Sequence, residues 1–91
     1  MRLLFVCTGN TCRSPMAASL ARKLAEERGL TDLVVESAGT GAYDGTTASD
    51  GALLVAMERG DDLSMHRART LTPEIIERAD LILTMGDRHL A

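Results

Sequence analysis

Cys7 and Arg13 are the residues whose types and spacing most clearly suggest chemistry. They stand six positions apart, within the stretch Cys7-Thr8-Gly9-Asn10-Thr11-Cys12-Arg13-Ser14-Pro15. A loop of this length can curl so that its backbone N–H groups point to one centre and bind a tetrahedral oxyanion such as phosphate. Arg13 can add two parallel hydrogen bonds to phosphate oxygens, and the sulfur of Cys7 would lie below the phosphorus.

The same surroundings would prepare Cys7 to attack phosphorus. The thiolate is the nucleophilic form of cysteine, and backbone amides, a helix N-terminus and Arg13 all favour it. Gly9 can adopt the positive φ that a tight loop often needs, and Ser14 is suited to cap the following helix, with Pro15 in its first turn. The alternative is a buried cysteine in an ordinary strand-to-helix turn.

The residues on either side of this loop predict the elements that position it. The apolar run Leu3–Cys7 predicts a strand, and apolar residues at 16, 17, 20, 21, 24 and 25 predict a helix over Pro15–Arg28 that ends at Gly29. The later elements are a strand at 33–35, a loop over 37–49, a helix from Ser49 or Asp50 to about Arg59, a short helix opened by Thr72-Pro73, a strand at 81–83, and a helix start at Asp87.

The core-facing residues of the two later helices are expected to be Ala52, Leu53, Ala56, Met57, Ile75, Ile76 and Ala79. Such alternation of strands and helices is typical of a parallel sheet with helices on both faces, so we predict a three-layer α/β/α fold. Ligands bind such sheets beyond the carboxyl ends of the strands, where the Cys7 loop and Ser37 would meet.

Length and composition limit the possible classes of protein. The 91 residues allow one domain, and an apolar content of 45% suits a globular core. A net charge of −3 gives no sign of a nucleic-acid or membrane partner. The N-terminus lacks the layout of a signal peptide, so a cytoplasmic location is expected. Nothing in the composition indicates an oligomeric state.

The chain offers little for a disulfide framework or a metal. Its only cysteines are Cys7 and Cys12, and its only histidines are His66 and His89. Neither set has the spacing of a zinc site, and no carboxylates cluster at ligand spacing. We therefore predict no metal and no cofactor.

Residues 5–17, from Phe5-Val6-Cys7 to Pro15-Met16-Ala17, resemble the N-terminal signature of the low-molecular-weight protein-tyrosine phosphatases. Further matches are the stretches Ser37-Ala38-Gly39, 62–69 and 79–85. The resemblance covers essentially the whole chain. It implies a hydrolase without a cofactor, in which Cys7 forms a thiophosphate intermediate that water then hydrolyses, and a phosphorylated protein or small phosphomonoester as substrate.

The resemblance also implies roles for residues around the loop. Asn10, Ser14, Ser37 and His66 would form a hydrogen-bonded network that shapes it, and Asn10 tolerates the left-handed conformation. Cys12 would be a resolving thiol that closes a reversible disulfide with oxidised Cys7. From the residues alone, Cys12 is equally well a small loop residue, and His66 is better explained as an exposed residue beside a helix.

Thr11 bears on the choice of substrate. The tyrosine phosphatases of the family usually carry a bulky apolar residue there, whereas Thr11 resembles the bacterial protein-arginine phosphatases. A hydroxyl can pair with a guanidinium N–H that an aliphatic side chain would leave unpaired. Threonine as a merely tolerated loop residue is the alternative. Tyr43 could pack against a substrate or be an ordinary loop aromatic.

The family has a further C-terminal portion, with an Asp-Pro loop whose aspartate serves as general acid. This sequence contains no Asp-Pro, so residues 1–91 are interpreted as a single phosphatase domain, the N-terminal part of the usual fold. Asp44, Asp61 and Asp62 are possible substitutes for the acid. A function of another class, a phosphate-binding domain with little turnover, is the alternative.

Overall fold

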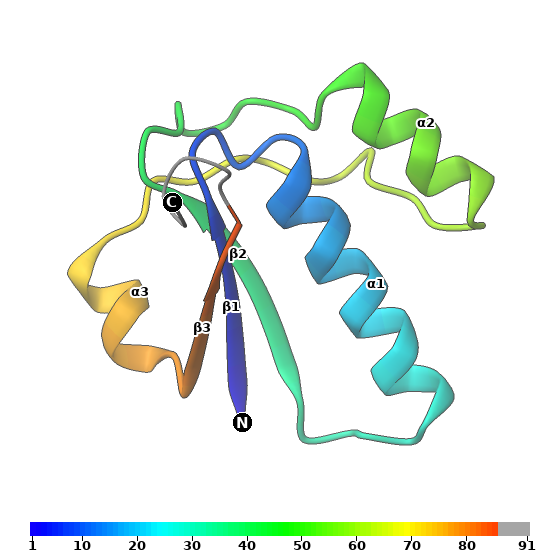
Figure 1. The fold of residues 1–91 in the computed structure, drawn as a ribbon, viewed down its shortest axis with the longest axis horizontal. Coiled ribbons are helices and arrows are strands. Elements are labelled where there is room, and N and C mark those ends of the chain that lie inside the picture. Colours follow the sequence, from blue (N-terminus) through cyan, green and yellow to red (C-terminus); the bar gives the residue numbers. More distant parts are fainter. Residues whose placement is uncertain (86–91) are drawn as a thin grey trace.

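The computed structural model describes residues 1–85, so the helix start expected at Asp87 lies outside the described residues. Three parallel strands, β1 (Arg2–Cys7), β2 (Val34–Gly39) and β3 (Leu81–Thr84), form a sheet in the order β2-β1-β3. Figure 1 shows β1 at the centre of the sheet, and the carboxyl ends of the strands point to the same edge. The loop after β1 therefore lies at the edge where ligands bind such sheets.

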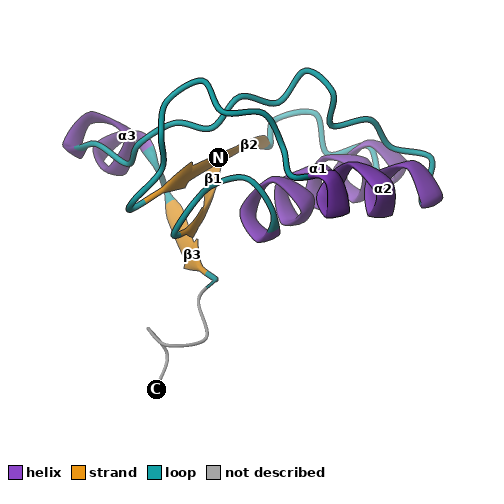
Figure 2. Ribbon diagram, turned by 90° about the horizontal axis from the view of Figure 1, so that it is seen from above, coloured by secondary structure: helices purple, strands orange, loops and turns teal. Residues whose placement is uncertain are grey.

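Helices cover both faces of this sheet. Helix α1 (Arg13–Glu27) packs on one face, and α3 (Pro73–Arg78) packs on the opposite face. Helix α2 (Asp50–Glu58) lies against α1 on the same side (Figure 2). The predicted three-layer α/β/α class and the predicted order of elements are confirmed. No helix in residues 1–85 is both long enough and apolar enough to cross a membrane.

Strand β2 extends further than its sequence predicts. Residues 37–39 were expected to begin a loop, but Ser37 pairs with Phe5, and Gly39 pairs with Cys7. Serine and glycine have little preference for strands, and here the ladder with the buried β1 decides their conformation. As a result Ser37 is fixed on a strand beside the loop that follows Cys7.

Helix α1 begins two residues before the predicted start. Its N-cap is Cys12, which makes no side-chain capping bond, and Ser14 lies inside the first turn. The prediction of Ser14 as the cap was therefore wrong, because its hydroxyl bonds elsewhere. Pro15 does lie in the first turn, where its missing N–H costs nothing. The predicted stop at Gly29 is supported by its φ of 69°.

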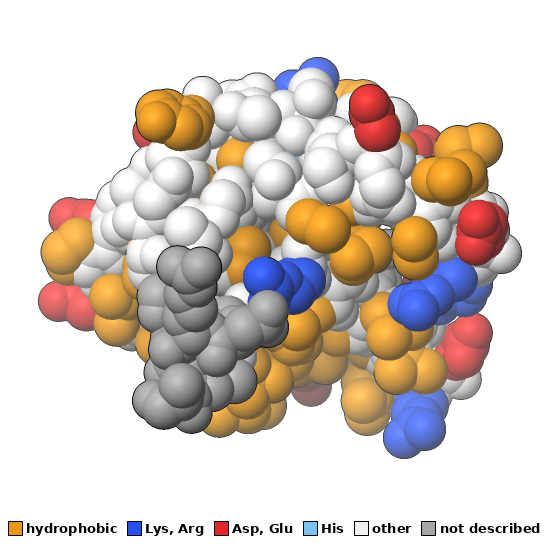
Figure 3. Space-filling model, turned by 45° about the horizontal axis from the view of Figure 1, so that its top comes forward, with side chains coloured by type: hydrophobic (Ala, Val, Ile, Leu, Met, Phe, Trp, Pro, Cys, Tyr) orange, Lys and Arg blue, Asp and Glu red, His pale blue; other side chains and the backbone are white. Residues whose placement is uncertain are grey.

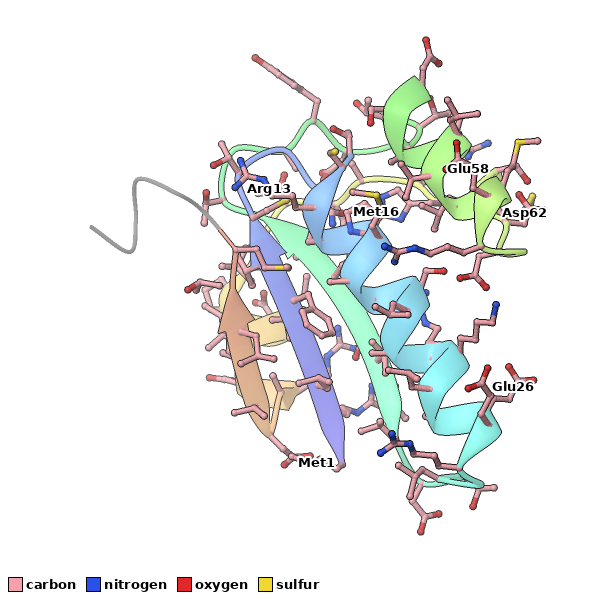
Figure 4. All side chains as sticks on the ribbon, turned by 45° about the vertical axis from the view of Figure 1, so that its right-hand side comes forward. Met1, Arg13, Met16, Glu26, Glu58 and Asp62 are labelled. Atoms are coloured by element: carbon pink, nitrogen blue, oxygen red, sulfur yellow. The ribbon has the colours of Figure 1, made fainter. Side chains whose placement is uncertain are left out.

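Two small apolar clusters hold the layers together. Leu4, Val6 and Ala38 are buried on the α3 face, where Leu71, Ile75 and Ala79 pack against them. Ala48, Ala52, Ala56 and Leu63 form the second cluster, with Met16 and Leu53 packed against it. Figure 4 shows Met16 between α1 and α2.

Met57 and Ile76 were expected to face the core, but they are 69% and 43% exposed. Each helix meets its neighbour along one narrow stripe. Ala52 and Ala56 occupy that stripe on α2, and Ile75 occupies it on α3. The next residue along the helix points about 100° away from the stripe and remains in solvent.

Candidate active site

The loop between β1 and α1 lies at the carboxyl edge of the sheet, and the loop after β2 holds it from the side. The N–H of Thr40 donates to the carbonyl of Cys7 at 2.9 Å. Further along, the N–H of Ser49 donates to the carbonyl of Thr11 at 2.8 Å. Because these bonds are made by backbone groups of a neighbouring segment, they fix the path of the loop from outside.

The sulfur of Cys7 is the focus of the loop. Cys7 is the last residue of β1 and is 8% exposed. The N–H of Asn10 donates to Sγ at 3.1 Å, and the hydroxyl of Ser14 lies 2.9 Å from the same sulfur. Since the Ser14 oxygen already accepts a bond from Asn10 Nδ2, its own hydrogen is available to donate to sulfur. Two donors aimed at one sulfur stabilise negative charge on it.

Asn10 adopts the left-handed conformation, with a φ of 54°, and is the only non-glycine residue with positive φ in residues 1–85. Gly9, the other residue that the sequence suggested for this conformation, does not have positive φ. The fully buried side chain of Asn10 fixes the strained backbone. Its Nδ2 donates to Ser14 Oγ at 2.8 Å and to Ser37 Oγ at 2.9 Å, and its Oδ1 accepts from the N–H of Arg69 at 2.9 Å.

His66 completes this network from a distant part of the chain. Its Nε2 lies 2.7 Å from the carbonyl oxygen of Asn10, so the ring donates to that oxygen. The structure therefore brings together Asn10, Ser14, Ser37 and His66, the four residues that the resemblance grouped. Residue type alone favoured an exposed His66, and the only signal for its position was the matching stretch 62–69.

Arg13 and Cys12 lie at the far end of the loop. Arg13 is the first residue of α1 and is exposed. Figure 4 shows it beside the carboxyl end of β1. On the face seen from this end, one group of Lys or Arg side-chain atoms lies near the centre, while the other basic atoms and most acidic atoms lie toward the margins (Figure 3). Cys12 is exposed while Cys7 is buried, and both are free thiols. A helix of this length directs the positive end of its dipole toward the loop.

Gly39 is a supporting residue whose role sequence reasoning missed. A Cβ at this position would lie 2.6 Å from the carbonyl oxygen of Thr8 and 3.0 Å from Cβ of Asn10. Contacts this short with backbone cannot be relieved by a side-chain rotation. Gly39 therefore allows the end of β2 to approach the loop, and the only signal for it was its place in the Ser37-Ala38-Gly39 match.

Replacing Gly39 with alanine should weaken the affinity for inorganic phosphate and lower the melting temperature, because the loop must move away from the added methyl group. A displacement of this size can cost about 10²-fold at a positioned site. Isothermal titration with phosphate measures the effect. Gly51→Ala is the matched control, since a Cβ there meets nothing within 4 Å. Unchanged phosphate affinity in Gly39→Ala would show that this close approach does not position the loop.

Two of the three carboxylates suggested as proton donors, Asp44 and Asp62, make hydrogen bonds to residues outside the Cys7 loop. Asp44 Oδ1 accepts bonds from the N–H and the hydroxyl of Thr70 at 2.7 and 3.0 Å. Asp62 accepts from the N–H of Ser64 at 2.8 Å, and its hydrogen bonds with the backbone and side chain of Ser64 hold the pKa of Asp62 below its usual range. Within residues 1–85, no three His, Cys, Asp or Glu side chains are grouped so as to hold a metal ion.

A parallel α/β sheet with a thiol at the end of its central strand, facing a tight loop and a helix N-terminus, defines the class of cysteine-containing phosphate-binding loop proteins. The family model described as "Low molecular weight phosphotyrosine protein phosphatase" matches residues 2–91. The chain belongs to this family.

Individual relatives show the same likeness. The probable low molecular weight protein-tyrosine-phosphatase EpsP of Ralstonia solanacearum is 48% identical over 84 residues, which cover 92% of this chain and 54% of EpsP. The protein-arginine-phosphatase of Bacillus subtilis (strain 168) is 44% identical over 89 residues, covering 98% of this chain and 58% of that protein.

Among solved structures, a cysteine-to-serine mutant of the YwlE arginine phosphatase, with a phosphorylated active-site serine, matches with a TM-score of 0.91 and 42% identity. The match covers 98% of this chain and 57% of that one. The chain therefore spans a little more than half the length of the relatives it matches.

Proposed function

We propose that this chain is a protein phosphatase that hydrolyses phosphotyrosine through Cys7. The observation that carries the proposal is the sulfur of Cys7, buried at the end of β1 and contacted by the Asn10 N–H at 3.1 Å and the Ser14 hydroxyl at 2.9 Å. A thiolate stabilised in this way can attack phosphorus. The phosphatase names of the relatives support the same chemistry.

In the proposed reaction, the bond from Cys7 sulfur to phosphorus forms while the bond from phosphorus to the tyrosine oxygen breaks. The phenol leaves, and water then cleaves the thiophosphate to give phosphate and the free thiol. Arg13 and the N–H groups of residues 8–14 bind the three remaining phosphate oxygens and stabilise the charge that builds up on them. The chain needs no cofactor or metal for these steps, because Arg13 and the amides supply the positive charge.

The remaining residues of the loop have supporting roles in this proposal. Asn10, Ser14, Ser37 and His66 hold the loop in its strained shape, and Cys12 protects oxidised Cys7 by forming a disulfide with it. Residues 1–91 act as one domain, the N-terminal part of the family's fold, on a phosphorylated protein or a small phosphomonoester in the cytoplasm.

Steady-state hydrolysis separates this enzyme from a phosphate-binding domain with little turnover. The purified chain is mixed with p-nitrophenyl phosphate or a phosphotyrosine peptide, and released phosphate is measured. Repeated turnover per chain is the result expected of the enzyme. Stoichiometric binding of phosphate with no release of product from either substrate would favour the binding domain.

Hydrolysis of phosphoarginine is a second candidate function, and Thr11 is the observation that favours it. Thr11 is half-buried in the phosphate loop, and its backbone is held by the N–H of Ser49. Its hydroxyl can accept a hydrogen bond from the guanidinium of a phosphoarginine substrate. A relative 44% identical to this chain is named a protein-arginine-phosphatase.

Changing Thr11 to isoleucine tests which of the two substrates the loop favours. If Thr11 selects phosphoarginine, the ratio of kcat/KM for phosphoarginine to that for phosphotyrosine should fall by about tenfold or more, roughly 1.4 kcal/mol. Thr40→Ile makes the same chemical change at an exposed position in the neighbouring loop. An unchanged ratio in Thr11→Ile would rule out Thr11 as the selecting residue.

A further inference from the structure

The outer edge of β2 is covered by two arginine side chains. β2 is an edge strand, so its outward carbonyl groups lack a neighbouring strand. Arg22, on α1, donates from Nε and Nη2 to the carbonyl of Val35 at 3.2 and 2.8 Å. Arg69 donates from Nε to the carbonyl of Ser37 at 2.9 Å. The two guanidinium groups therefore lie next to each other along one strand edge.

A third arginine joins them around a hollow of about 280 Å³. Arg67 donates from Nη1 to the carbonyls of Ser64 and His66 at 3.1 and 2.8 Å, so its position is also fixed. The residues that line the hollow are Arg22, Glu36, Ser37, His66, Arg67 and Arg69. They include three guanidinium groups but one carboxylate, so the hollow carries an excess of positive charge.

The single carboxylate that lines the hollow, Glu36, already forms ion pairs with two arginines. Glu36 Oε2 lies 2.6 Å from Nη2 of Arg69, while its Oε1 lies 2.8 Å from Nη1 of Arg2, outside the hollow. These contacts, chiefly the one with Arg69, hold the pKa of Glu36 below its usual range. Burial lowers the pKa of Arg22, the negative charge of Glu36 raises it, and the positive charge of Arg69 lowers it by less than Glu36 raises it. Arg22 and Arg69 therefore repel each other, and the carboxylate of Glu36 offsets this repulsion.

Coverage of the strand edge does not account for this arrangement. One neutral donor per carbonyl would be enough, and each guanidinium has five N–H groups. The hydrogen bonds seen use two nitrogens of Arg22, two of Arg69 and one of Arg67. In the part of the chain that the structure describes, the remaining nitrogens of these three residues have no protein partner. Their donors are available to a ligand in the hollow.

We propose that this hollow is a second anion site, which binds a small tetrahedral dianion of the phosphate type. Arginine makes two parallel hydrogen bonds to phosphate oxygens, and three guanidinium groups held at one hollow suit an anion with several oxygens. The site is separate from the Cys7 loop but lies directly behind it. Two of its lining residues, Ser37 and His66, hydrogen-bond to Asn10 of that loop. This site goes beyond the proposed hydrolysis, because none of its arginines belongs to the reacting loop.

Residue-resolved nuclear magnetic resonance tests the site in the whole 91-residue chain. Inorganic phosphate is titrated at constant ionic strength set with chloride, and the Nε–Hε signals of Arg22 and Arg69 are followed together with the amide signals of Gly9 and Asn10. The arginine signals should saturate with a dissociation constant of their own, different from that of the loop amides. Sulfate is titrated in a second experiment. It should shift the same arginine signals if the site recognises the tetrahedral shape and the charge of the anion.

Two single-charge variants make the test specific. Arg67→Gln should weaken the arginine-detected phosphate affinity by about tenfold, the loss expected for one charge-assisted contact, and leave the Gly9 titration unchanged. Lys23→Gln removes the same charge from α1, but its Nζ contacts the carbonyl of Arg59 rather than the hollow, so it should change neither titration. The amide spectrum of each variant shows whether it is folded.

Three results would overturn the proposal. The arginine signals could stay unmoved at tens of millimolar phosphate, or follow the same curve as the loop amides, which would report the Cys7 loop alone. Equal weakening in Arg67→Gln and Lys23→Gln would show diffuse attraction by surface charge. Activity is not part of this readout, so failure of the second site and failure of the phosphatase proposal are distinguishable.

Discussion

Replacing Cys7 with serine should lower kcat for phosphotyrosine by about 10⁴-fold or more and leave the affinity for inorganic phosphate within a few-fold of the original. A serine hydroxyl is a far weaker nucleophile than a thiolate, whereas the N–H groups and Arg13 that bind phosphate remain in place. Hydrolysis rates and isothermal titration with phosphate, both on the purified variant, measure the two effects separately.

Cys12→Ser is the matched control, because it makes the same change of sulfur to oxygen in the same loop, at an exposed thiol. This variant should keep nearly full turnover under reducing conditions. If Cys7→Ser turned over substrate normally, or if Cys12→Ser were the inactive variant, the assignment of the nucleophile would be wrong.

Arg13→Lys should lose both phosphate affinity and turnover. An ammonium group keeps the positive charge but cannot make two parallel hydrogen bonds to phosphate oxygens. We expect kcat/KM to fall by about 10³-fold, as when an arginine that stabilises a phosphoryl transition state is removed. Hydrolysis rates and isothermal titration with phosphate measure both effects. Cys7→Ser should lose turnover and keep phosphate binding, whereas Arg13→Lys should lose both.

Arg28→Lys provides the comparison for this change, since Arg28 is exposed at the opposite end of α1, where it is the C-cap residue. It should bind phosphate and turn over substrate as the unmodified chain does. If Arg13→Lys retained full phosphate affinity, the positive charge alone would be sufficient, and the proposed bidentate contact would have no role.

The order of the elements could be predicted because it depends on local patterns. The apolar run before Cys7, the stop at Gly29, a helix start at Ser49 or Asp50 and one at Thr72-Pro73 are all visible in short windows. The structure confirms each one, with Ser49 and Thr72 as the N-caps. The extension of β2 through Ser37 to Gly39 was not visible in this way. It depends on pairing with β1, more than thirty residues earlier in the chain.

The residues of the site differed in how far they could be predicted from the sequence. Cys7 and Arg13 could be proposed from their spacing, and Ser37 could be placed at the same edge of the sheet from the end of its strand. The contacts of His66 and Ser37 with Asn10 span 56 and 27 positions, so their part in the hydrogen-bonded network was predicted only from the family resemblance. Gly9 and Asn10 were both candidates for the left-handed position, and the structure has Asn10 there. Asparagine also tolerates that conformation, and the bonds from its buried side chain to Ser14 and Ser37 decide between the two residues.

Contacts made by backbone groups could not be predicted from residue type. The N–H of Arg69 that binds Asn10 Oδ1 would be present whatever side chain stood at that position. The approach of Gly39 to the Thr8 carbonyl likewise depends on an absent Cβ. Both contacts emerge only when the loop, the end of β2 and the segment before α3 are seen together in space.

Trapping the phosphorylated intermediate tests most directly whether Cys7 is the nucleophile of a phosphatase. The chain is mixed with a radiolabelled phosphotyrosine peptide, quenched within a single turnover, digested and mapped by mass spectrometry. We expect close to one phosphoryl group per active chain, bound to the sulfur of Cys7, and none in Cys7→Ala. Hydrolysis of the substrate with no phosphoryl group on Cys7, or with the label on another residue, would contradict this expectation.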